Sequence, residues 1–165
     1  MSIWALPLGA PPGFDRKPVP IVEGPGAANH SQFSPNGRWI AYAYIAAESG
    51  PFQVFVQSAP GSGGPAGKWQ VSIAGGAMPQ WRRDSKELFF LRGNELMAVP
   101  VKSDGTTFEF DAPEMLFEIR RGVSLRNHFT PSADGQRFLF AWPNETDETG
   151  QIYVILDWPT LLKKP

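Results

Sequence analysis

Two histidines are the side chains in this sequence best suited to hold a ligand. His30 and His128 lie 98 residues apart, and each directly follows an asparagine, Asn29 and Asn127. A neutral imidazole coordinates metal ions, and a protonated imidazole attracts anions. If the fold brings the two Asn-His pairs together, they form a candidate site for a metal ion or an anion.

The charged clusters favour solvent exposure over catalysis. The segment 144–148, which reads Asn-Glu-Thr-Asp-Glu, could offer carboxylates to calcium, but it lacks the alternation and the glycine of a calcium-binding loop. Arg82-Arg83 and Arg120-Arg121 could hold a phosphate or a carboxylate if they converged. A solvated turn and solvent-facing arginines are the simpler interpretations.

No other arrangement of residues predicts a reaction. The sequence has no cysteine, no Gly-x-Ser-x-Gly nucleophile motif and none of the kinase motifs. The glycine-rich segment 60–67 leads into Lys68-Trp69 and not into the Lys-Ser/Thr ending of a phosphate-binding loop. A net charge of −1 gives no general attraction for nucleic acid. We therefore expect no catalytic residue, no cofactor, no standard metal centre and no nucleic-acid partner.

The elements that must position these residues follow from an internal repeat. Asn36, Asp84 and Asp134 hold equivalent positions, each followed by Gly or Ser and then by a short apolar run. Asn, Asp and Gly tolerate the positive φ values of tight turns, so each copy predicts a turn that opens into a buried strand. The copies recur about every fifty residues, in the segments 33–42, 81–90 and 130–140.

A period of this length that carries strands predicts the blades of a β-propeller. The expected fold is all-β, with antiparallel four-stranded blades and about three blades in the chain. His30 and His128 then occupy the same position in blades one and three, with Met78 between them in blade two. Their repetition has two explanations, a ligand site at the mouth of the channel or simple inheritance of a repeated residue.

The blade boundaries follow from the same alignment. Residues 3–8 repeat the pattern of residues 96–101, so the chain is expected to begin at the third strand of a leading blade. The apolar runs after the turns should be buried between neighbouring sheets, namely Trp39, Ile40, Tyr42, Leu88, Phe90, Phe138 and Phe140. The expected parts are 1–23, the last two strands of the leading blade; 28–74, blade one; 77–119, blade two; and 127–162, an incomplete blade three.

The segment Phe33-Ser34-Pro35-Asn36-Gly37 resembles the TolB-like, WD-like propeller repeat of bacteria, with Asn in place of Asp. The later copies depart from that pattern, since Arg82-Arg83 replaces Ser-Pro and Ser85 replaces Gly. Five further stretches resemble the C-terminal propeller region of bacterial serine/threonine protein kinases of the Acidobacteria type: 67–72, 79–84, 86–90, 97–101 and 155–164.

That resemblance implies a sensor or docking module on the extracytoplasmic side of a membrane, with phosphotransfer in a separate domain. The N-terminus lacks the basic start and the long apolar stretch of a signal peptide, and no segment approaches the length of a spanning helix. The leading prediction is a non-catalytic propeller that presents loops to a protein, peptide or glycan partner. The alternative is the regulatory end of a kinase or the gating propeller of a serine peptidase.

The strand count also bears on assembly. Propellers close into a ring, and an open end of stacked sheets leaves apolar faces and strand edges bare. The sequence therefore predicts either a head-to-tail homodimer or a chain that is one part of a longer, internally closed ring.

Overall fold

The computed structural model describes residues 2–6, 17–46, 50–64, 66–103, 107–119, 129–142 and 151–155. In these ranges every regular element is a β-strand, and all strand pairs are antiparallel. The strands are β1 (Ile3–Ala5), β2 (Val19–Val22), β3 (Ala27–Phe33), β4 (Trp39–Ile45), β5 (Gln53–Ser58), β6 (Lys68–Gln70), β7 (Ala77–Trp81), β8 (Glu87–Arg92), β9 (Glu95–Lys102), β10 (Glu109–Phe110), β11 (Glu114–Glu118), β12 (Phe129–Pro131), β13 (Phe138–Trp142) and β14 (Gln151–Ile155).

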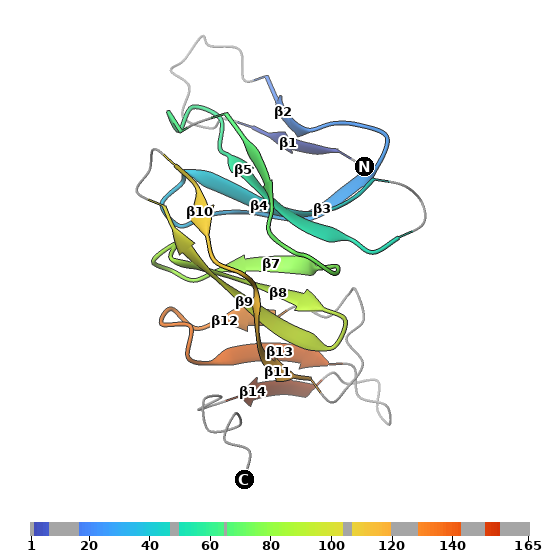
Figure 1. The fold of residues 1–165 in the computed structure, drawn as a ribbon, viewed down its shortest axis with the longest axis vertical. Helices are drawn as coiled ribbons and strands as arrows, with labels where there is room; N and C mark the ends of the chain where they lie inside the picture. Colours follow the sequence, from blue (N-terminus) through green and yellow to red (C-terminus); the bar gives the residue numbers. More distant parts are fainter. Residues whose placement is uncertain are drawn as a thin grey trace.

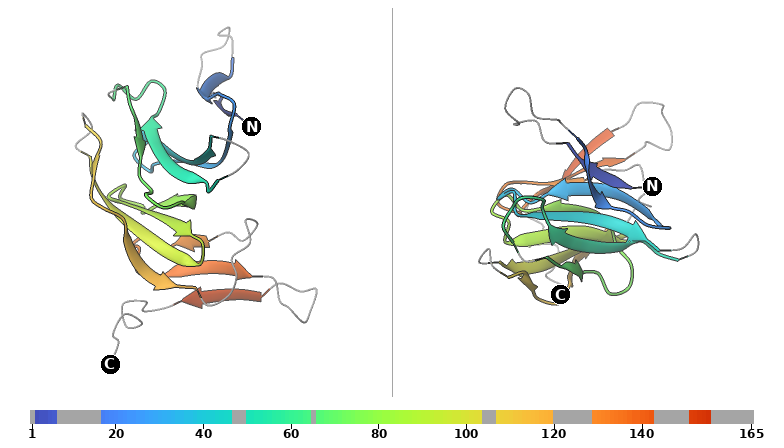
Figure 2. Two further views of the ribbon diagram at one scale, coloured as in Figure 1. Left: turned by 45° about the vertical axis from the view of Figure 1, so that its right-hand side comes forward. Right: turned by 90° about the horizontal axis from the view of Figure 1, so that it is seen from above.

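The strands form four sheets that stack face to face along the long axis of the molecule (Figure 1). We call them the leading hairpin (β1–β2), blade one (β3–β6), blade two (β7–β11) and blade three (β12–β14). Within blades one and three, consecutive strands are neighbours, as in a meander, and the same holds for β7, β8, β9 and β10 of blade two. The left view of Figure 2 shows the same order, with the leading hairpin at one end and β12–β14 at the other. This is the all-β, partial propeller that the sequence predicts.

Blade two differs from the expected four strands in its outer edge. A four-stranded blade has one outer strand, but β10 and β11 both pair with β9 and together make up that edge. The edge is interrupted at residues 111–113. Pro113 has no backbone N–H to donate to a ladder, which is a physical reason for the break.

The repeated turns share one hydrogen-bond scheme. In blade one, the Gly37 amide donates to the Ser34 carbonyl (2.8 Å), and the Ser34 amide donates to the Trp39 carbonyl (2.8 Å). The Asn36 side-chain oxygen accepts from the Arg38 amide (3.1 Å). Gly37 has a φ of 71°, in the left-handed region that glycine adopts without strain. The side chain that the repeat preserves thus closes the turn.

The same scheme holds in the other two blades. The amides of Ser85 and Gly135, which are equivalent to Gly37, donate across their turns over 2.9 Å each. The carboxylates of Asp84 and Asp134 accept the amide two residues further on, over 3.0 Å in both cases. Ser85 has a φ of 61°, so this turn keeps the left-handed geometry without a glycine.

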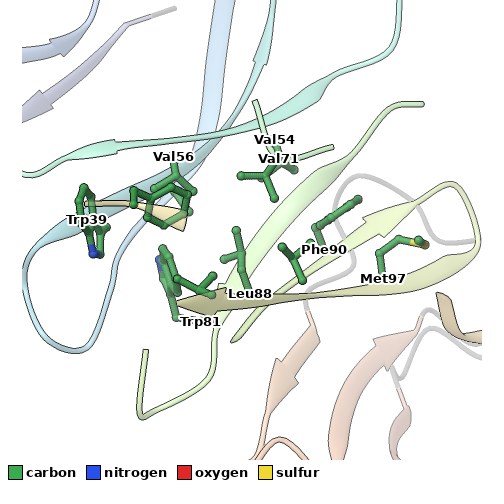
Figure 3. Packing of buried hydrophobic residues seen from close by; sticks show 12 residues of the cluster. Trp39, Val54, Val56, Val71, Trp81, Leu88, Phe90 and Met97 are labelled. Atoms are coloured by element: carbon green, nitrogen blue, oxygen red, sulfur yellow. The ribbon is translucent and has the colours of Figure 1, made fainter. Parts of the chain in front are cut away.

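The core lies between the sheets, because the second strand of each blade is apolar on both faces. One cluster fills the space between blades one and two, where Val54 and Val56 face Leu88 and Phe90 (Figure 3). A second cluster fills the space between blades two and three, where Phe89 packs against Phe138 with ring centroids 4.9 Å apart. All seven side chains expected in the core are buried, which confirms that expectation: Trp39, Ile40, Tyr42, Leu88, Phe90, Phe138 and Phe140.

Truncation of Phe90 tests the importance of this packing. Phe90→Ala removes a fully buried ring from the cluster between blades one and two, and we expect a loss of about 3–5 kcal/mol in the free energy of unfolding. Equilibrium urea denaturation measures it. Ile73→Ala is the control, because Ile73 is 75% exposed and its truncation should change stability by less than about 0.5 kcal/mol. Equal small losses in both variants would contradict the assigned core.

Candidate functional site

The inner strands of the three blades, β3, β7 and β12, lie next to one another and form the side on which propellers line their channel. An amide ladder connects the first two. Gln32 donates from Nε2 to the Gln80 side-chain oxygen (3.1 Å), and its own Oε1 accepts the Trp81 backbone amide (3.0 Å). Gln32 thereby satisfies a backbone donor at the edge strand of the next blade, where such groups otherwise remain unpaired.

The repeated position of His30 is a backbone feature. His30 and its equivalent Met78 both have a left-handed conformation, with φ values of 51° and 54°. Each lies at a β-bulge, where the register of β3 on β4 shifts between Asn29 and Gln32 and that of β7 on β8 shifts at the same place. The Nδ1 of His30 donates to the Asn29 side-chain oxygen over 2.7 Å. The Asn-His pair therefore lies at a bulge of the inner strand, and the same bulge forms at Met78 without such a pair.

The other half of the predicted histidine site lies outside the described residues, since both Asn127 and His128 fall there. A site that joins His30 and Asn29 to His128 and Asn127 stays a prediction. In the part of the chain that the structure describes, no three His, Asp or Glu side chains gather in a way that could hold a metal ion. The acidic segment 144–148 and Arg120-Arg121 also lie outside that part.

Arg83 is exposed, as the sequence suggested, whereas Arg82 is only partly exposed. The side chain of Arg82 is only 24% exposed and holds two carboxylates, those of Asp84 (Nε to Oδ1, 2.8 Å) and Glu87 (Nη1 to Oε2, 2.6 Å). In blade one the Ser34 hydroxyl donates to the equivalent Asn36 side chain over 2.7 Å. Arg82 takes over that donor role in blade two, so both of its carboxylate contacts serve the turn.

These contacts change the acidity of the two carboxyl groups in opposite directions. The hydrogen bond from Arg82 lowers the pKa of Asp84 below its ordinary value, with help from the Lys86 backbone amide. Burial raises the pKa of Glu87, although Arg82 opposes that effect. The pair belongs to the fold of the turn and offers no proton-transfer partner of its own.

A cation lies against three aromatic rings on blade one, which the sequence analysis missed. The Lys68 ammonium is 4.3 Å from the ring centroid of Phe55, 4.5 Å from that of Tyr44 and 5.8 Å from that of Tyr42. Burial lowers the pKa of Lys68 and raises the pKa of Tyr42 to about 12. No local signal marks this cluster, because three strands bring its members together.

An apolar hollow of about 80 Å³ lies between the leading hairpin and the inner strand of blade one. Trp4 and Phe33 border it and are about half exposed, at 53% and 54%. No charged side chain lines it. The lining residues are Ile3, Trp4, Ala5 and Ile21 from the hairpin and Ser31, Gln32, Phe33 and Ile40 from blade one. We call this surface the leading face.

The exposure of Phe33 is unusual for its position in the repeat. Its equivalent in blade two, Trp81, is 5% exposed because blade one covers it. Phe33 faces the leading hairpin, of which the structure describes two strands, β1 and β2. These strands leave much of its ring uncovered. The leading face is therefore the best candidate among the described residues for binding a partner.

The comparisons with known proteins agree with this architecture. A scan of protein-family models and a search of curated proteins gave no match. Among solved structures, the chain is similar to TolB from Acinetobacter baumannii, with 16% identity and a TM-score of 0.57 over 84% of this chain and 32% of that one. It also resembles a putative 6-phosphogluconolactonase from Bacteroides uniformis, with 18% identity and a TM-score of 0.46 over 89% and 47% of the two chains.

The stacked meanders and the repeated turn define a β-propeller architecture. Its fold is similar to that of TolB, and this chain spans about a third of the length of TolB. Identity at this level bears on the fold alone. The resemblance to the propeller region of bacterial kinases stays a prediction. In the described residues there is no helix suited to crossing a membrane.

The low pKa of Asp84 makes a prediction about acid stability. A carboxyl whose pKa is lower in the folded chain contributes stability above its unfolded pKa of about 3.8, and that contribution is lost as the pH falls through the folded value. Asp84→Asn should therefore reduce the fall in unfolding free energy below that pH. Because the Asp84 side chain is 46% exposed, the change should be small and should shrink in high salt.

Urea denaturation from about pH 2 to about pH 7 would measure the effect, because this range covers the pH values at which carboxyl groups titrate. The matched control is Asp84→Asn in an Arg82→Gln background. There the main cause of the low pKa of Asp84 is gone, so the substitution should alter the slope of unfolding free energy against pH less. An equal change in slope in both backgrounds would show that Arg82 does not set the pKa of Asp84.

Proposed function

We propose that this chain is a non-catalytic binding module, the docking or sensor part of a larger assembly, and that its leading face binds an apolar segment of a protein partner. The observation that carries the proposal is the half-exposed Phe33, whose equivalent in blade two is buried. Apolar side chains exposed together at the edge of a stacked core are typical of protein-binding surfaces.

The polar residues that the repeat preserves support a structural use over a catalytic one. Asn36, Asp84 and Asp134 close their turns, and Arg82 holds the turn of blade two. Gln32 joins neighbouring inner strands. Each of these side chains makes contacts within the chain that account for its position. A reaction would require a nucleophile and base, or a metal cage, from other residues.

The chemistry of the leading face favours one kind of partner. Its lining is uncharged and more apolar than polar, and its polar side chains are those of Gln32 and Ser31. A charged peptide or a sulfated or acidic glycan would find no opposite charge there. A segment with one or two large apolar side chains would fill the hollow and cover Phe33 and Trp4.

A display experiment tests this proposal. Folded chain, attached at low density to a surface, is offered a displayed library of random short peptides. We expect the captured peptides to be rich in aliphatic and aromatic residues, and we expect Phe33→Ser to reduce their capture at least tenfold, the fold-change that corresponds to about 1.4 kcal/mol.

Ile73→Ser is the matched control, because it removes another highly exposed apolar side chain that lies outside the hollow. It should leave capture unchanged. Capture that survives Phe33→Ser, or that is lost equally in both variants, would rule out the leading face as the binding surface. Circular dichroism of each variant confirms that it is folded.

A further inference from the structure

We infer that the occupant of the leading face is the opposite end of a second copy of this chain, so that copies join head to tail. The inference rests on the proposed binding role and names its partner. The opposite end is the side of blade three that points away from blade two, which we call the trailing face. It carries Leu139, which is 42% exposed, and a hollow of about 310 Å³ bordered by Thr130, Pro131, Ser132, Arg137, Phe138 and Leu139.

The two junctions inside the chain show what each face requires. On the second strand of every blade, one set of alternating side chains faces the preceding blade and the other set faces the next. Leu88 and Phe90 pack toward blade one, whereas Phe89 and Leu91 pack toward blade three. Both junctions join a trailing face to a leading face. A junction between two copies would join surfaces of the same two kinds.

The trailing face of blade three carries the side chains that this rule leaves uncovered. Leu139 is equivalent to Phe89, which is 1% exposed because blade three covers it. In the described residues no sheet follows blade three, and Leu139 is left half exposed. Thr130, paired with Leu139 on the same face, holds the position of Gln32 and Gln80, whose amides join neighbouring inner strands.

The leading face lacks the matching cover in two places. Phe33 is exposed where its equivalent Trp81 is buried. Gly37 has open space where a Cβ would stand, whereas a Cβ at its equivalent Gly135 would lie 2.8 Å from Cδ of Arg82, in the turn of the preceding blade. On the side that faces the preceding blade, the turn of blade one is thus uncovered, whereas the turn of blade three is covered by blade two. The hairpin β12–β13 of a second copy has the right elements to cover both.

The contact would be heterologous, with a different surface on each side, and such contacts produce closed rings or open filaments. Two copies of about three blades each fall within the 4–8 blades at which propellers close. The joint would have one strand in excess, because β1 and β14 both hold the third position of a blade. A closed ring therefore requires either β1 or β14 to give up the third position, beside the second strand of the shared blade.

Light scattering after size-exclusion chromatography tests the inference on the intact chain. We expect the wild-type chain to run at twice the monomer mass at micromolar concentration. Phe33→Asp places a charge on the leading face and Leu139→Asp places one on the trailing face, and each alone should give monomers. Phe33→Ser and Leu139→Thr provide milder versions should a charged variant fail to fold.

Mixing the two variants distinguishes this assembly from any other. A dimer of one Phe33→Asp copy and one Leu139→Asp copy has one junction made of two native faces, so mixing the monomers should restore the doubled mass. A symmetric contact of two leading faces would ignore Leu139→Asp and would not be restored by mixing. Ile73→Asp, outside both faces, should leave the dimer intact.

The outcomes separate this inference from the proposed function. A wild-type chain that remains monomeric while it captures peptides through Phe33 overturns the second copy as occupant and leaves the binding role standing. A monomeric chain without Phe33-dependent capture overturns both. A dimer that both substitutions dissolve and that mixing restores supports both.

Discussion

Every part of this structure depends on sheets that are apolar on both faces. In blades one and two the second strand cannot alternate between core and water, because another sheet lies on either side of it. Strand β8 illustrates the constraint, since Leu88 and Phe90 are buried against one blade and Phe89 and Leu91 against the other. Such a sheet is stable only within a stack, and the sheet at each end of the stack needs another surface to cover its outer apolar face.

That constraint explains why the repeated polar residues serve structure. The turns must place each second strand in register with the first, and the side chains of Asn36, Asp84 and Asp134 do so by accepting backbone amides. Arg82 shows that the donor to the turn side chain can differ in chemistry, because a guanidinium donates to Asp84 where a serine hydroxyl donates to Asn36 in blade one. A binding function then falls to the surfaces that the stack leaves uncovered.

The sequence predicted the candidate sites less well than the fold. His30 was a candidate because its position repeats, and the structure supplies a backbone reason for the repetition, a left-handed bulge shared with Met78. Arg82 was expected in solvent and is instead half-buried beside two carboxylates. The cation on Tyr44 and Phe55 had no signal, because Lys68 reaches those rings only when β4, β5 and β6 pair.

The sequence by itself determined the blade architecture, the turns and the buried side chains, because strand alternation and turn chemistry act between residues close together in the chain. Only the tertiary structure decided which equivalent residues are covered. Phe33 and Trp81 hold the same position of the repeat, and each follows a glutamine, yet one is exposed and the other buried. The difference comes from the sheet stacked against each of them, and a local sequence pattern contains no information about that neighbouring sheet.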